Sequence, residues 1–319
     1  MKPFAQTPED AVSTLGETRL IHLIRQWLGS TSPKSPAGIG DDCAVVSGSP
    51  RLQLITVDPV IYREHFDDSI PARGVGEKLF KRNLSDVAAM GGRARAAVIA
   101  LALDEQVSVP WLADFYRGLA RVARRYHVPV IGGDVARHQG GLVATLTLLG
   151  EATTNRAVTR VGARPRDWIY VTGRLGGSLL GHHWKFTPRM TEGAWLAARP
   201  EVRALMDVSD GIAKDLSALT PTGCVARVRS QSVPISAAAR RLARQTGRSP
   251  LAHALSDGED YELLFVVDGR TDRAAFEAEW KKAFRLNLSC LGRFEQAASS
   301  SPSDEYINWA DHHGYEHLG

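Results

Sequence analysis

The order of apolar patterns along the chain predicts alternating strands and helices. Leucine, isoleucine and tryptophan recur at helical spacing within residues 14–28, which indicates an amphipathic helix that packs on a core. Continuous apolar runs rich in β-branched residues indicate buried strands. The runs that predict strands are 52–58, 96–103, 128–134, 142–152, 167–173, 204–207, 257–267 and 288–294. A further helix is predicted at 111–126. This alternation favours the α/β class.

The stretch from Lys78 to Gly92 predicts a helix with an unusual order of charges. Leu79 and Val87 lie at positions that face a core, and Gly91 followed by Gly92 is typical of a helix end. Acidic side chains stabilise the first turn of a helix, where they complement the dipole, yet Asp86 falls in a late turn. A bound cation would compensate for this placement, and a merely solvated carboxylate is the alternative interpretation.

Length and composition restrict the class of protein. A chain of 319 residues suits two domains, which we expect at 1–150 and 151–319. A net charge of +4 with basic residues spread along the chain gives no reason to expect nucleic acid as a partner. No segment has the length and apolarity of a membrane span or a signal peptide, so we expect a cytoplasmic protein. An odd number of cysteines without a CxxC pair argues against a disulfide framework or a structural zinc.

Single acidic residues recur in short motifs from both halves of the chain, most of them at the predicted end or beginning of a strand. No cysteine or histidine cluster accompanies them, and an oxygen-only ligand set suits Mg²⁺. The sequence contains neither a GxxxxGK[ST] loop nor the motif set of protein kinases, so carboxylate-bound metal would have to neutralise the phosphates of any bound ATP. The acids are Asp42, Asp58, Asp86, Asp134, Asp207 and Asp210.

A glycine-rich turn, GRLGGS, follows the predicted strand at 167–173. Such a turn can cradle a phosphate through its backbone amides, but the signal is weak and a simple turn is the favoured interpretation.

The ordered motifs GIGDD, TVD, NLSDVAAMGG, IGGD, MDVSDG and DGEDYEL resemble thiamine-monophosphate kinase of the aminoimidazole-ribonucleotide-synthetase-like superfamily, and the resemblance covers nearly the whole chain. It implies an α/β (α+β) fold of two domains. The N-terminal domain would carry a mixed sheet that pairs across a homodimer, and the C-terminal α/β domain would close the site. The implied reaction transfers the γ-phosphate of ATP to thiamine monophosphate with Mg²⁺. We expect direct in-line transfer without a phosphoenzyme, because no activated nucleophile accompanies the acids and the acceptor phosphate is already anionic.

The resemblance also implies roles for particular residues. His65 becomes a candidate for orienting the acceptor, and Asp58, Asp86, Asp134 and Asp210 the catalytic carboxylates. Arg63, which departs from the family pattern, is our own further candidate for orienting the acceptor. The metal ligands would be Asp42, Thr56, Asp58, Asp86, Asp134, Asp207 and Asp210. ATP would contact Tyr116, Gly133, Asp134, Arg160 and Ser209, and thiamine monophosphate would contact His65, Glu259 and Tyr315.

Several positions depart from the family pattern. Val57 replaces a second hydroxyl before Asp58, and Val135 follows GGD where many relatives have threonine. The acceptor loop, commonly VEGVHF, reads IYREHF at 61–66. SGTxGDS becomes TGRLGGS, which adds Arg174 and replaces an acid by Gly177. These changes affect the expected acceptor contacts more than the metal-binding acids.

Alternatives come from sister enzymes and from a different class of protein. A selenophosphate synthetase would carry a reactive cysteine in the region that reads TSPKSPAG here, and a hydrogenase-maturation relative would end in a cysteine-bearing tail instead of GYEHLG. A purine-synthesis enzyme has no reason to carry DGEDYELLF. A non-catalytic nucleotide-binding homologue would be expected to lose metal-binding acids, and this sequence keeps all of them.

Overall fold

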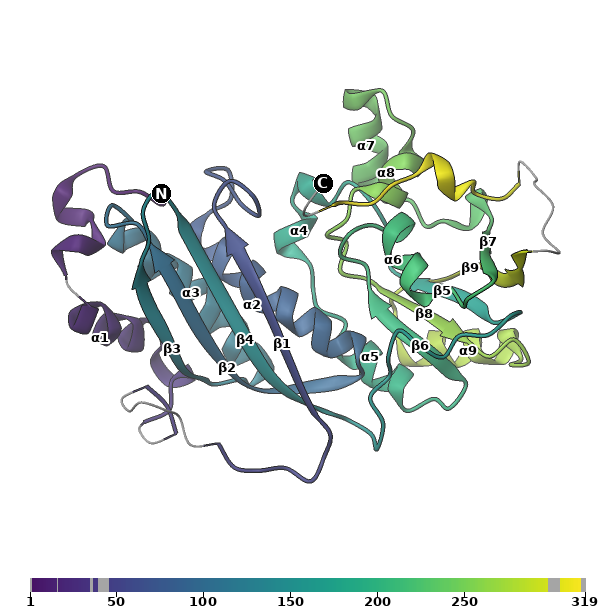
Figure 1. Ribbon diagram of the computed structural model, residues 1–319, viewed down its shortest axis with the longest axis horizontal. Helices are drawn as coiled ribbons and strands as arrows, with labels where there is room; N and C mark the ends of the chain where they lie inside the picture. The colour runs from purple at the N-terminus through teal and green to yellow at the C-terminus, as the bar shows by residue number, and fades with distance from the viewer. Residues whose placement is uncertain (1, 16, 35–36, 40–45, 298–304, 317–319) are drawn as a thin grey trace. The chain divides into compact units, whose positions relative to one another are not determined.

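The computed structural model describes residues 2–15, 17–34, 37–39, 46–297 and 305–316 (Figure 1). Contacts divide the chain into two compact units. Unit 1 comprises residues 1–87 and 93–152, and unit 2 comprises residues 88–92 and 153–319. Within the described residues no helix combines the length and the apolar character needed to cross a membrane.

Unit 1 is built on a mixed four-stranded sheet in the order β1-β4-β2-β3. β1 and β4 pair antiparallel, whereas β2 and β3 pair parallel. Figure 1 shows α2 and α3 on one face of this sheet, and α1 packs against α3. The elements are α1 (Glu17–Leu28), β1 (Gln53–Ile61), α2 (Ala72–Ala89), β2 (Gly92–Leu103), α3 (Val109–Tyr126), β3 (Val130–Arg137) and β4 (Leu142–Ala152).

The two faces of this sheet differ in burial. The side chains of Leu146 and Leu148 on β4 are fully buried beneath the helices. On the opposite face, which we call the open face, Ile55 and Val57 of β1 are 74% and 58% exposed. Because side chains alternate along a strand, Thr56 and Asp58 point from β1 toward the helical face.

Unit 2 contains a five-stranded sheet in the order β6-β8-β5-β9-β7, all of whose neighbours pair antiparallel. Its strands are β5 (Trp168–Thr172), β6 (Val202–Asp207), β7 (Cys224–Val228), β8 (Leu263–Val267) and β9 (Leu288–Gln296). Its helices are α4 (His182–Lys185), α5 (Met190–Ala197), α6 (Ile212–Leu219), α7 (Ala237–Thr246), α8 (Pro250–Ser256) and α9 (Arg273–Ala283). One apolar cluster packs under α6 and α8, and a second, rich in aromatic rings, packs under α5 and α9.

The predicted α/β class and the mixed N-terminal sheet are confirmed, but several element boundaries were wrong. The helix expected from Lys78 begins at Ala72. β1 continues past Asp58 to Ile61, and β3 continues past Asp134 to Arg137, so these two acids lie inside strands. β8 begins at Leu263, after the acidic DGEDYE segment. Cys224 and Cys290 are free thiols, and Cys43 lies outside the described residues.

Candidate functional site

Asp86 is held by a hydroxyl from the neighbouring strand. α2 carries Asp86 in its last turns, and the Thr56 Oγ1 atom of β1 donates a hydrogen bond of 2.5 Å to Asp86 Oδ2. The pair places a hydroxyl oxygen and a carboxylate side by side on the helical face of the sheet. These are hard oxygen donors of the kind that Mg²⁺ prefers.

Basic residues of α2 hold the segment that follows the middle of β1. Arg82 Nη2 lies 3.5 Å from Asp58 Oδ1, and Arg82 Nη1 donates to the carbonyl oxygen of Pro59 at 2.8 Å. Lys78, which is fully buried, donates from Nζ to the carbonyl oxygen of His65 at 2.7 Å. Arg82 and Lys78 therefore fix the end of β1 and the predicted acceptor loop.

The acceptor loop has a strained turn at Arg63. Arg63 has a φ of 73°, which is uncommon for a residue with a side chain. His65 accepts the Ile61 backbone N–H at Nδ1 with a distance of 3.2 Å. Arg63 and His65 are therefore displayed by a compact turn at the end of β1.

Asp134 lies on the other face of the unit 1 sheet. In the parallel ladder it pairs with Ala100, whose neighbours Ile99 and Leu101 are buried under the helices. Paired residues in a ladder point to the same face, so Asp134 projects to the open face, away from Thr56 and Asp86. The structure of one chain thus does not bring Asp134 together with the other acids of unit 1.

Two residues predicted to contact ATP in unit 1 have structural roles here. Tyr116 is 2% exposed and packs against Trp27 and Phe115, and burial raises the pKa of its hydroxyl. At Gly133 a Cβ atom would lie 2.1 Å from the carbonyl oxygen of Ile99, so close strand packing requires glycine. Their contacts with ATP stay predictions.

Arg160 is exposed, and Asp42 lies outside the described residues.

Unit 2 brings its predicted residues together at the end of β6. Asp207 is the last residue of that strand, and Ser209 and Asp210 follow it. The Glu259 N–H donates to the Ser209 carbonyl at 2.7 Å, and the Tyr315 N–H donates to the Asp210 carbonyl at 2.8 Å. Residues predicted separately for metal, ATP and acceptor are thus joined through their backbones.

Asp215 was missed by the sequence interpretation. It lies in the first turn of α6, and its Oδ2 accepts the backbone N–H groups of Ser209 at 3.0 Å and Asp210 at 3.1 Å. Burial, followed by the nearby charges of Asp207 and Asp210, raises the pKa of Asp215 to about 8. The available signal was an acid five residues after Asp210 in a first helical turn, where it can bond back to the preceding loop.

Lys214 also shapes this loop. Its Nζ atom lies 2.9 Å from Asp210 Oδ2 and donates to the Tyr315 carbonyl oxygen at 2.7 Å. One cation therefore joins a predicted metal ligand to the C-terminal segment that carries the predicted aromatic contact.

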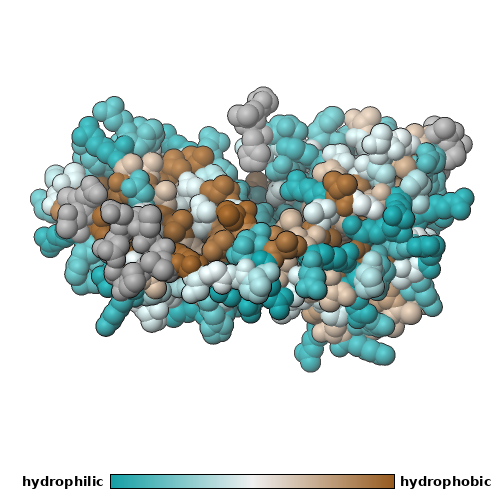
Figure 2. All heavy atoms as spheres, turned by 60° about the horizontal axis from the view of Figure 1, so that its bottom comes forward, coloured by the Kyte–Doolittle hydropathy of each residue, from teal (hydrophilic) through white to brown (hydrophobic). Residues whose placement is uncertain are grey.

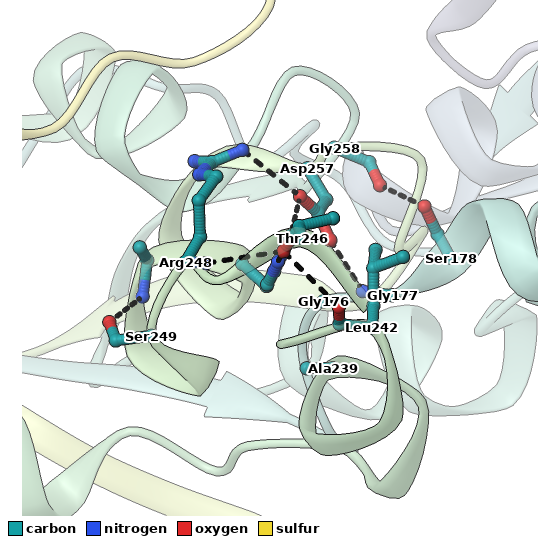
Figure 3. Close-up of polar contacts among 12 residues, drawn as sticks. Gly176, Gly177, Ser178, Ala239, Leu242, Thr246, Arg248, Ser249, Asp257 and Gly258 are labelled. Atoms are coloured by element: carbon teal, nitrogen blue, oxygen red, sulfur yellow. Dashed lines mark hydrogen bonds and ion pairs between the residues drawn. The ribbon is translucent and has the colours of Figure 1, made fainter. Parts of the chain in front are cut away.

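The glycine-rich turn does not offer its amides to a phosphate. The Gly176 N–H donates to Asp260 Oδ1 at 2.8 Å and the Gly177 N–H donates to Asp257 Oδ2 at 2.7 Å. Figure 3 shows Gly177 against Asp257, and Ser178 against the carbonyl of Gly258. Carboxylates of the chain occupy the donors that a phosphate would need, so the simple-turn interpretation is confirmed.

The described residues of neither unit contain three histidine, cysteine or acidic side chains placed to hold a metal ion together. Unit 1 supplies Thr56, Asp58 and Asp86 on one face of its sheet, and unit 2 supplies Asp207 and Asp210. The donor set is all oxygen and fits Mg²⁺ in its chemistry.

Comparison with known proteins identifies the family. Residues 40–152 match the family described as AIR synthase related protein, N-terminal domain. Thiamine-monophosphate kinase of Rhodopirellula baltica is 38% identical over 245 residues, which cover 74% of this chain and 77% of that protein. The chain belongs to the thiamine-monophosphate kinase family. The thiamine-monophosphate kinase of Salmonella typhimurium is 36% identical over 79% of this chain and 82% of its own length.

Solved structures of thiamine-monophosphate kinases share the fold. The enzyme from Stenotrophomonas maltophilia has a TM-score of 0.73 at 30% identity, covering 86% of this chain and 94% of that one. AaThiL complexed with AMPPCP and TMP has a TM-score of 0.69 at 30% identity, covering 89% and 92%. The hydrogenase maturation protein HypE has a TM-score of 0.70 at 18% identity, covering 87% and 89%, a likeness of fold alone. The resemblance drawn from the motifs and the fold class are confirmed.

Proposed function

We propose that this protein transfers the γ-phosphate of ATP to thiamine monophosphate and forms thiamine diphosphate. The observation that carries the proposal is the backbone linkage of Ser209, Asp210, Glu259 and Tyr315 at the end of β6. The solved relative that was complexed with AMPPCP and TMP supports both substrates.

The residues of the chain would bind and orient the two substrates. The acceptor phosphate is already anionic, so it needs positioning more than a strong general base. Arg63 and His65 sit on the compact turn after β1 and would orient that phosphate. Glu259 and Tyr315 would hold the thiamine end, because an aromatic ring stacks well on a cationic heterocycle.

We also propose that transfer is direct, without a phosphoenzyme. Neither the described carboxylates nor their neighbours present an activated serine, cysteine or histidine nucleophile of the kind that covalent catalysis uses. Isolation of a phosphorylated protein on the turnover pathway would refute direct transfer.

Magnesium is the metal that these oxygen donors suit. We propose several Mg²⁺ ions, with Thr56, Asp58 and Asp86 as ligands in unit 1 and Asp207 and Asp210 as ligands in unit 2. Asp42 and Asp134 are further proposed ligands. When bound, Mg²⁺ would neutralise charge on the phosphates of ATP. Asp58 and Asp210 each contact a cationic side chain of the chain itself, Arg82 and Lys214.

A homodimer through the open face of the unit 1 sheet is the quaternary structure we propose. Figure 2 shows hydrophobic residues gathered on the side occupied by unit 1, and Ile55 and Val57 are the large exposed apolar residues of β1. Exposed apolar clusters of this kind mark interaction surfaces. Asp134 projects from the same face, so dimerisation would place it at the interface.

Replacing Ile55 and Val57 together by aspartate tests the dimer. We expect a homodimer of the wild type by light scattering and a monomer of the double variant. Leu179→Asp, at a residue of unit 2 that is 63% exposed, is the matched control and should leave the mass unchanged. An equal mass for wild type and double variant would contradict this interface.

Product analysis tests the proposed reaction. Purified protein would be incubated with Mg²⁺ and ATP, together with thiamine monophosphate, free thiamine or no acceptor, while ADP and thiamine diphosphate are both quantified. Thiamine diphosphate that forms only with the monophosphate is the expected result. ADP release without thiamine diphosphate would indicate that the acceptor is that of a sister enzyme.

A cytoplasmic location stays a prediction.

A further inference from the structure

Unit 2 contains a cavity of about 480 Å³ that none of the predicted metal, ATP or acceptor residues lines. Its walls come from the glycine-rich turn after β5, from α4 and the residues following it, from the segment before β8 and from the turn before β9. This volume falls in the range of small-molecule sites, which is roughly 300–1,000 Å³.

Arginine dominates the charge of the cavity. Arg174, Arg189 and Arg285 all line it. Arg189 is neutralised, because Nε and Nη2 donate to the two oxygens of Glu262 at 2.8 and 2.5 Å. Arg174 and Arg285 form no hydrogen bond or ion pair with any residue in the described part of the chain. Two exposed arginines thus line the same cavity without a carboxylate partner in the described part of the chain.

The wall behind these arginines is rigid. Glu262 Oε2 also accepts a hydrogen bond from the Thr172 hydroxyl at 2.6 Å, so its carboxylate is fixed from two sides. Gly173 has a φ of 62°, and a Cβ atom there would lie 2.0 Å from Glu262 Oε1. The chain therefore approaches Glu262 as closely as glycine permits, which holds Arg174 in its position beside the cavity.

A buried acid in the cavity lining has an unused oxygen. Asp260 is 2% exposed, and its Oδ1 accepts the Gly176 N–H. Its Oδ2 has no hydrogen-bond partner within the described residues. Burial raises the pKa of Asp260 well above its usual value, which favours the protonated carboxyl, a form that can donate to a ligand oxygen. A buried polar atom left unpaired costs about 1–3 kcal/mol, a cost that a ligand oxygen would remove.

We propose that this cavity binds a small phosphate monoester or inorganic phosphate, with the phosphate oxygens on Arg174 and Arg285 and one ligand oxygen on Asp260. The planar donor fork of arginine matches phosphate oxygens, and a dianion balances the two unpaired guanidinium charges. The site needs no Mg²⁺, in contrast to the carboxylates proposed to hold the metal. Its lining shares no residue with the metal, ATP and acceptor residues proposed above.

Calorimetric titration with inorganic phosphate in EDTA tests this site. Removal of metal prevents metal-bridged binding at Asp58, Asp86 and Asp210. We expect saturable binding to the wild type that weakens about tenfold or more in the Arg174→Ala/Arg285→Ala double variant, because two charge-assisted contacts are lost. The matched control is Arg240→Ala/Arg241→Ala, which removes two exposed arginines from α7 and should bind as the wild type does.

Further variants separate this site from the catalytic one. Asp86→Asn should leave metal-free phosphate binding unchanged. Titration with glycerol 3-phosphate is then compared with titration with inorganic phosphate. Tighter binding of the ester indicates that the natural ligand is an organic phosphate, and equal binding indicates the free ion. Equal affinity in the wild type and the Arg174/Arg285 double variant, or loss of binding in Asp86→Asn, would overturn the proposal. The single variants Arg174→Ala and Arg285→Ala give the same test should the double variant fail to fold.

Discussion

The two units position their predicted site residues in different ways. Unit 2 ties Ser209, Asp210, Glu259 and Tyr315 together by backbone hydrogen bonds at one end of β6. Unit 1 holds an acid by a side-chain hydrogen bond, from Thr56 to Asp86. Its Asp134 lies on the opposite face of the sheet.

This difference has a physical consequence. Backbone contacts in unit 2 fix the loop after β6 whether or not a ligand is bound. We therefore expect that part of the site to be preformed. Under the proposed function, the acids of unit 1 would depend on partners outside the chain, a metal ion for Asp86 and a second subunit for Asp134. Substitutions in unit 1 should therefore affect catalysis, whereas those in the loop of unit 2 should affect folding as well.

Asp86→Asn should have the largest effect. Loss of an anionic metal ligand should lower kcat/KM by about a hundredfold or more, or roughly 3 kcal/mol. Steady-state kinetics at several Mg²⁺ concentrations measures this. Asp114→Asn is the control, because Asp114 pairs with Arg73 and is not among the predicted site residues. A wild-type rate for Asp86→Asn at saturating Mg²⁺ would refute the assignment.

Asp215→Ala should have the second-largest effect, a lower free energy of unfolding. The change leaves the backbone N–H groups of Ser209 and Asp210 without their acceptor, which should cost about 1–3 kcal/mol. Asp215→Asn keeps a carbonyl oxygen that can accept both bonds, so it should stay close to the wild type. Denaturant unfolding compares the two variants. If Asp215→Ala were as stable as Asp215→Asn, the loop would not depend on this carboxylate.

Lys214→Met should have a smaller effect that is confined to the acceptor. It removes the contacts with Asp210 Oδ2 and with the carbonyl of Tyr315, so the C-terminal segment should dock less firmly. Partly exposed ion pairs contribute about 0.2–1 kcal/mol, which corresponds to a rise of a few-fold in KM for thiamine monophosphate. The thermal midpoint should barely move. A change in KM for ATP alone would show that Lys214 acts elsewhere.

Asp268→Asn should have the smallest effect, in unit 2 but outside the site. Hydrogen bonds from Arg270, and then the charge of Arg203, hold the pKa of Asp268 below its usual value. A lowered pKa stabilises the folded state above the unfolded pKa of about 4, and this contribution is lost as pH falls through the folded pKa. Wild type and variant should therefore differ in unfolding free energy by less than about 1 kcal/mol at pH 7.

The pH profile provides the internal control for Asp268→Asn. The difference in unfolding free energy should shrink as pH falls below about 4, and the KM values at pH 7 should be unchanged. A difference that stays constant with pH would show that the effect of the substitution does not come from the ionised carboxylate.

Local patterns of apolar residues in the sequence were enough to predict much of the fold. The core positions Leu79 and Val87 are buried as the helical spacing predicted, and β6 ends on Asp207 as expected. Boundaries failed where tertiary contacts extend an element. β1 continues to Ile61 because its ladder with β4 runs that far, and no local signal in the sequence marks this pairing.

The site was less predictable because its geometry depends on contacts between distant parts of the chain. Asp215 accepts hydrogen bonds from two backbone amides that lie five and six residues earlier. Arg82 of α2 contacts Asp58 of β1, which lies 24 residues earlier. The face on which Asp134 lies depends on the register of β2 with β3, which has an irregularity between Ala97 and Val98. A pattern of single acids could not give these placements.

The most direct test of the proposed kinase activity follows the phosphate itself. Wild-type protein would be mixed with ATP carrying a labelled γ-phosphate, Mg²⁺ and thiamine monophosphate under single-turnover conditions, and the label would be followed in thiamine diphosphate, protein and free phosphate. We predict that the label appears in thiamine diphosphate at the rate at which it leaves ATP, with none bound to protein. Label released only as free phosphate would contradict the proposed function.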